Sequence, residues 1–135
     1  MRTLTGLVLA VALTACGGQE PPPEPSSEPA ARPSSTGQVR VVEPEPGAEV
    51  EGPDVRVVIE LTGAELIEEV SVDLQPDEGH IHLKLDGETI TLLGGLEEVV
   101  PDVAPGPHLL EVEFVAADHG PFNPRVVQTI AFRVA

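Results

Sequence analysis

The stretch Gly79-His80-Ile81-His82-Leu83-Lys84-Leu85-Asp86-Gly87 decides the fold. Its apolar residues, at positions 81, 83 and 85, alternate with two histidines and a lysine. This is the period of a β-strand that turns one face toward a core. Asp86-Gly87 then supplies a two-residue hairpin signal. We therefore expect a central strand of an antiparallel sheet, with both imidazoles on the face opposite the core.

Similar short runs fill the second part of the chain. They lie at 39–41, 55–61, 88–93, 96–100, 108–117 and 125–134, separated by glycine, proline and aspartate. The segment 64–78 is compatible with a helical turn followed by a short strand. About seven strands without a longer helical period predict an all-β fold, an immunoglobulin-like antiparallel β-sandwich.

The composition limits which partners the protein can bind and how its fold can be stabilised. The 135 residues carry a formal charge of −16, which argues against binding nucleic acid. With three Phe and no Trp or Tyr, the core has to be built from Val, Leu and Ile. A single cysteine excludes an intramolecular disulfide.

The N-terminus has the form of an export signal. Arg2 precedes a short apolar run that ends Leu13-Thr14-Ala15-Cys16, too short to span a bilayer. This resembles the lipobox of bacterial lipoproteins. The resemblance implies cleavage before Cys16, acylation of that cysteine with chains such as palmitate, and partnership with a membrane through this anchor. Gly17 in the next position implies sorting to the outer membrane in a diderm bacterium.

The chain then divides into a linker and one domain. Residues 1–15 are assigned to the lipoprotein signal peptide, and residues 16–37 to the lipidated cysteine and a proline-rich linker. Prolines at 21, 22, 23, 25, 29 and 33 favour extended polyproline II structure over a packed core. Residues 38–135 are assigned to the immunoglobulin-like domain.

Three of the four histidines are expected to meet. In an immunoglobulin-like sheet the strand that holds His80 and His82 is the third, and the run 108–117 is the sixth and its antiparallel neighbour. The start of the third strand then lies near the end of the sixth, which is followed by Asp118-His119. His108 opens the sixth strand roughly 25 Å away at about 3.3 Å per residue. It is expected to be a structural corner histidine that bonds a turn carbonyl.

Convergent imidazoles suit a metal, but also other roles. His80, His82 and His119 are candidate ligands of Cu²⁺ or Zn²⁺, with Asp118, Asp77 or Glu78 completing the shell. Alternatively, the histidines hydrogen-bond loops and pack across the sheet, or they contact another ligand. A His-x-His pattern alone does not separate these alternatives. The sequence therefore assigns no cofactor, and copper or zinc is the alternative.

Catalytic groups are scarce in the sequence. Ser71 is the one serine after residue 38, and Cys16 is taken up by the anchor, so no nucleophile stands beside a base. Gly94-Gly95 lacks the lysine of a phosphate-binding loop. The sequence therefore favours a protein that is not an enzyme.

Three short motifs together resemble a known group of proteins. They are Gly79-His80-Ile81-His82, Pro105-Gly106-Pro107-His108, and Asp118-His119 before Pro121-Phe122-Asn123-Pro124. The same order occurs in exported bacterial immunoglobulin-like domains of unknown function. The resemblance covers about residues 79–134 and implies this fold and export, without an activity.

The sequence thus predicts a lipid-anchored cell-envelope module with a binding or structural role. The rival hypothesis is an envelope copper- or zinc-binding protein that uses its surface histidines. A third is recognition of a protein partner on the face of the third, sixth and seventh strands, called C, F and G in immunoglobulin notation. That idea rests on an expected outward strip of uncharged, apolar side chains on an acidic protein: Val115, Ala117, Val127 and Ala131.

Overall fold

The computed structural model describes residues 31–93 and 95–135, so the signal peptide, Cys16 and the linker up to residue 30 lie outside the described residues. Nine strands are formed in this part of the chain. In order they are β1 (Gln38–Glu43), β2 (Glu49–Val50), β3 (Val55–Thr62), β4 (Glu65–Leu66), β5 (Glu78–Leu85), β6 (Glu88–Leu93), β7 (Glu97–Val100), β8 (Gly106–Ala116) and β9 (Pro121–Val134). Two of them, β2 and β4, have only two residues each.

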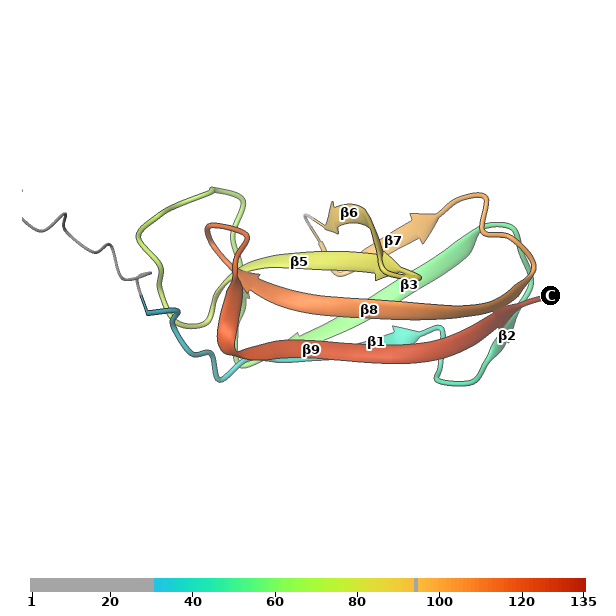
Figure 1. Cartoon of the computed structure of the whole chain (residues 1–135), viewed down its shortest axis with the longest axis horizontal. Helices are drawn as coiled ribbons and strands as arrows, with labels where there is room; N and C mark the ends of the chain where they lie inside the picture. Colours follow the sequence, from blue (N-terminus) through green and yellow to red (C-terminus); the bar gives the residue numbers. More distant parts are fainter. Residues whose placement is uncertain (1–30, 94) are drawn as a thin grey trace, which may run out of the picture. The chain divides into compact units, whose positions relative to one another are not determined.

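The strands form two sheets, which makes the protein an immunoglobulin-like β-sandwich (Figure 1). One sheet has the order β1-β3-β7, and the other β2-β9-β8-β5-β4, with β6 also paired to β5. In immunoglobulin notation these are A-B-E and A′-G-F-C, with C′ beyond C. The expected antiparallel pairing of the third and sixth strands is confirmed as β5 with β8. Only the two-residue strands β2 and β4 pair in parallel.

Alternating side chains from both sheets meet in one core. The register places Ile81 opposite Phe114 and Leu83 opposite Val112, and all four side chains are fully buried. The ring of Phe114 also stacks on Phe122, with centroids 5.2 Å apart. Valine, isoleucine and leucine therefore supply most of the core, and Phe114 and Phe122 close it beside the β8–β9 turn.

The hairpin between β5 and β6 turns on the predicted Asp86-Gly87 pair. Both residues have positive φ, 53° and 88°, as a tight hairpin turn with two left-handed central residues requires. The hairpin prediction is thus confirmed.

The prediction for segment 64–78 is wrong. The chain forms the short strand β4 and then bends, and no helix occurs among residues 31–93 and 95–135. Backbone bonds from Glu65 to Asp77 and from Ile67 to Gly79 hold this loop beside β5. Val70 and Val72, which looked like a strand, are 66% and 94% exposed because neither reaches the core. The described residues accordingly include no helix that could cross a membrane.

Two adjacent leucines give a matched test of the core. Leu110 is buried and Leu109 is 54% exposed. We expect Leu110→Ala to lower the free energy of unfolding by about 2–5 kcal/mol, because it leaves a cavity. Leu109→Ala should change it by less than about 0.5 kcal/mol. Urea unfolding of both variants measures the difference, and equal effects would contradict the assigned register.

Candidate functional site: a histidine cluster on the outer sheet face

Three imidazoles meet on the outer face of the β5-β8-β9 sheet. His80 and His82 come from β5, and His119 comes from the turn between β8 and β9. The His119 ring stacks on His80 with centroids 4.4 Å apart and an interplanar angle of 13°. Its Nδ1 lies 3.2 Å from Nε2 of His82. We call these three residues the histidine cluster.

Local backbone geometry brings them together. The β5–β8 register sets His80 opposite Val115, and Gly79 opposite Ala116 near the end of β8. A Cβ on Gly79 would lie 1.8 Å from the Val115 carbonyl oxygen, so glycine permits this close approach. His119 itself has φ of 63°, a left-handed conformation that is uncommon for a residue with a side chain. The backbone of this turn is therefore strained at His119, the residue whose ring covers His80.

Burial shapes the chemistry of the cluster. His80 is 8% exposed, and its Nε2 has no hydrogen-bond partner among the described residues. The pKa of His82 lies below its usual value, first because burial disfavours the imidazolium and second because His119 is close. Lys84 and His80 lower this pKa further, whereas Glu113 raises it. The structure thus favours a neutral His82, which has one N–H donor and one acceptor nitrogen, with Nε2 facing His119.

The arrangement is not a formed metal site. A tetrahedral metal with bonds of about 2.0 Å separates two nitrogens by about 3.3 Å, close to the spacing between His82 and His119. In the described part of the chain, however, no group of three or more His, Cys, Asp or Glu side chains is placed to hold a metal ion. The stacked His80 ring is parallel to His119, so the cluster would have to rearrange to offer a third nitrogen.

Two of the three acids proposed to complete a metal shell have other partners. Asp118 receives two hydrogen bonds from the Arg32 guanidinium, at 2.5 and 2.8 Å. This contact lowers its pKa to about 2. Asp77 accepts hydrogen bonds from Ser35 and Thr36, while Glu78 is exposed. Asp118 therefore supports the turn that carries His119 and is not free beside the cluster.

Next to His82, the outer face of the sheet carries a row of charged residues. Glu113 lies directly opposite His82 in the register and is 5% exposed. Arg125 donates to both of its carboxylate oxygens at 2.7 Å, and this bond lowers the pKa of Glu113. Lys84 binds the next acid along β8, Glu111, at 3.0 Å. This ion-pair row fixes the surface beside the cluster.

His108 lies at the other end of β8. Its Nε2 is 2.7 Å from the carbonyl oxygen of Ala104, the kind of turn contact expected of a corner histidine. Its Nδ1 is 2.7 Å from Asp86 Oδ2. Because both neighbours are acceptors, the imidazolium, with two N–H groups, satisfies both bonds. These contacts raise the pKa of His108, Asp86 being the larger cause.

The prediction of an outward strip of uncharged, apolar residues is wrong for two of its four members. Val115 and Ala117 are each 2% exposed, whereas Val127 and Ala131 are exposed. Val115 lies opposite His80, beside the ring that His119 covers, and the β4–β5 loop bonds the carbonyl of Ala117 through Ser71. The exposed members do not form a continuous patch with the buried ones.

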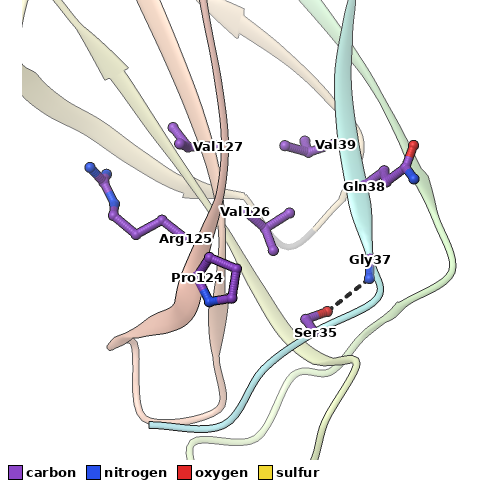
Figure 2. A pocket seen from close by; sticks show the side chains of 8 residues that line it. All are labelled: Ser35, Gly37, Gln38, Val39, Pro124, Arg125, Val126 and Val127. Carbon is purple, nitrogen blue, oxygen red and sulfur yellow. Dashed lines mark hydrogen bonds between the residues drawn. The ribbon is translucent and has the colours of Figure 1, made fainter.

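A shallow hollow of about 370 Å³ lies apart from the cluster, where β1 and β9 diverge (Figure 2). Its walls carry both polar and apolar side chains, and its one ionisable residue, Arg125, is paired with Glu113. The lining residues are Ser35, Gly37, Gln38, Val39, Pro124, Arg125, Val126 and Val127. The hollow offers no reactive group.

Sequence reasoning missed the roles of Arg32, Glu113 and Arg125. A signal for the first was present, since Arg32 is the only Lys or Arg between Arg2 and Arg40. In a chain with 23 Asp and Glu residues, such an isolated cation is expected to lie beside an acid. The pairing of Glu113 with Arg125 depends on the β8–β9 register, which the sequence pattern did not fix.

Comparison with known proteins adds little to this geometry. No family model and no curated protein matches the chain. A crystal structure described as an engineered protein is similar over 73% of this chain, with 14% sequence identity and a TM-score of 0.47. The chain spans 20% of the length of that protein.

The His108 contacts predict a pH-dependent effect on stability. A histidine whose pKa is raised by folding contributes stability that is fully present below the unfolded value of about 6.5 and is lost as the pH rises through the folded value. We expect His108→Gln to lower the free energy of unfolding more at about pH 5.5 than at about pH 9. Urea unfolding at both values measures this, and an equal loss at both would show that the charge is not involved.

Proposed function

We propose that this chain is a lipid-anchored cell-envelope protein whose immunoglobulin-like domain is a non-catalytic binding module. The binding surface is the outer face of the β5-β8-β9 sheet around the histidine cluster. One observation carries this proposal: an unpartnered, buried imidazole nitrogen of His80 beneath a strained turn. Strained backbone and unsatisfied buried polar atoms are uncommon, and they concentrate at functional sites.

The non-catalytic part of the proposal rests on the partners of the candidate catalytic groups. The Ser71 hydroxyl accepts a hydrogen bond from the Asp73 amide within its own loop. The buried carboxylate Glu113 is neutralised by Arg125. A base beside the cluster would need a nucleophile within hydrogen-bond reach, and these contacts supply none.

The anchor and address rest on the lipobox-like ending at Cys16. Acylation there would attach the protein to a membrane, and Gly17 favours the outer membrane of a diderm envelope. The three histidine motifs likewise support membership of the exported immunoglobulin-like domains that they resemble. The net charge of −16 favours cationic or neutral partners over nucleic acid. A protein partner on the C-F-G face would have to contact the histidine cluster and the ion-pair row of Glu113 and Arg125.

Occupancy of this face can be measured by histidine footprinting with diethyl pyrocarbonate. Modification of His82 and His119 in intact cells should fall relative to the purified full chain, with each rate compared to that of added N-acetylhistidine. Cys16→Ser should lose the acyl chains by mass spectrometry and, with them, the protection. Unchanged reactivity ratios in cells would contradict a binding role for this face.

The second candidate function is copper or zinc binding, favoured by the 3.2 Å spacing between the His82 and His119 nitrogens. Imidazole nitrogens are common ligands of both ions. The free Nε2 of His80 could supply the third ligand after His119 rotates away from the stack. The metal would then unstack the cluster.

Calorimetric titration of the full-length chain in detergent with Cu²⁺ and with Zn²⁺ tests this candidate. If a metal binds here, the full chain should show one stoichiometric site, His82→Ala should lose it, and His108→Gln should retain it. The last variant removes an imidazole from the opposite end and so is the matched control. A site that does not depend on His82, or none, removes metal binding while leaving the binding module to the footprinting test.

A further inference from the structure

Residues 32–37, just before β1, lie against the end of the domain that carries the histidine cluster. We call this segment the strap. It has no strand structure, but it is hydrogen-bonded to two separate loops. Arg32 binds Asp118 and also donates from Nε to the Pro121 carbonyl at 2.8 Å. The Pro33 carbonyl accepts from the Asn123 amide at 2.9 Å.

The other end of the strap is fixed to the β4–β5 loop. Ser35 Oγ donates to Asp77 at 2.7 Å, and the Thr36 hydroxyl donates to the same carboxylate at 3.1 Å. These bonds lower the pKa of Asp77, so the carboxylate stays charged and continues to accept them. In Figure 1 the start of the described chain, the β4–β5 loop and the β8–β9 turn lie together at one end of the sandwich, opposite the C-terminus.

Arg32 contacts residues that lie on both sides of His119 in the sequence. Asp118 precedes it, and Gly120 and Pro121 follow it. A Cβ on Gly120 would lie 2.5 Å from Nη2 of Arg32, so the guanidinium packs directly on this glycine. The turn has its own bonds as well, from the Gly120 amide to Asp118 and from the His119 amide to the Ala116 carbonyl. Arg32 thus holds both sides of a residue whose backbone is strained.

We propose that Arg32 is a positioning residue of the histidine cluster, and that the strap must be seated for His119 to cover His80 and to reach His82. The proposal rests on the proposed function for treating the cluster as a binding site. It extends that site to a segment that the sequence pattern assigned to the linker. A chain cut at Gln38 would keep every strand and lose the contacts that orient His119.

The chemistry of Arg32 suits this role. A guanidinium binds a carboxylate through two parallel N–H donors, which fixes direction as well as distance. It meets Asp118 in this two-point manner and has a third donor for the Pro121 carbonyl. A lysine would keep the charge with a single, freely rotating ammonium group, so it would restore attraction without full orientation.

The test reads the geometry of the cluster without any ligand. In the full-length chain in detergent, the rate at which diethyl pyrocarbonate modifies His80 reports whether His119 covers it. Added N-acetylhistidine is the reference, and His108, whose two ring nitrogens are bonded, reports global opening of the domain. We expect Arg32→Gln to raise the ratio of the His80 rate to this reference severalfold, and Arg32→Lys to give an intermediate rise. The pKa of His82, followed by NMR, should move up toward its usual value as His119 withdraws.

Arg56→Gln is the matched control, because Arg56 also bonds two different residues, the carboxylates of Glu43 and Glu97, but on the other sheet. It should leave the ratio unchanged. An unchanged ratio in Arg32→Gln, or a rise that His108 or Arg56→Gln shares, would overturn the proposal, because the effect would then be absent or global. Footprinting in cells and metal titration test the binding role, whereas the rate ratio in the purified chain tests the positioning role of Arg32. The failure of one role can therefore be distinguished from the failure of the other.

Discussion

The pairing of β5 with β8 is the interaction on which the rest of the structure depends. Seven residue pairs, from Gly79 with Ala116 to Leu85 with Leu110, are joined in this ladder. On its inner side the ladder buries Ile81 and Leu83 against the core. On its outer side the same register sets His80 and His82 beside the end of β8. A slip of one residue would turn both histidines into the core and the leucines into water. Core and candidate site are therefore specified by one set of backbone hydrogen bonds.

The alternation of side chains was enough to predict most of the fold. Strict period-two runs gave β3, β5 and β8, and Asp86-Gly87 gave the tight hairpin, because these features depend on local backbone preference and on a single buried face. The prediction for segment 64–78 was wrong because it relied on the same local pattern. Its valines have a strand-like pattern, but pairing of β4 with β5 and bonds to Asp77 and Gly79 carry the loop away from the core. Pattern alone cannot show that an apolar residue has nothing to pack against.

The meeting of His80, His82 and His119 was predictable, but the contacts among them and the partner of Asp118 were not. Strand order and phase bring His119 toward His80 and His82, which follows from topology. The ring stack, the burial of Val115 and the pairing of Asp118 with Arg32 depend on side-chain placement in a turn and on a segment outside the strands. The small number of Lys and Arg residues accounts for part of the difference between the predicted and the observed contacts. Each of the six Lys or Arg residues in the described part of the chain lies in an ion pair, so every one is placed against an acid. Arg32 is the one among them that joins a segment before the first strand to the histidine turn.

The position of this arginine also determines how the domain would respond to mechanical load. A pull on the chain at Ala31 reaches the Arg32 contacts with Asp118 and Pro121 before it reaches any backbone ladder of the sandwich. These few bonds would part first, and the β1–β3 pairing would bear tension only afterwards. Traction applied at Ala31 would therefore break the Arg32 contacts on either side of His119 while both sheets stayed intact.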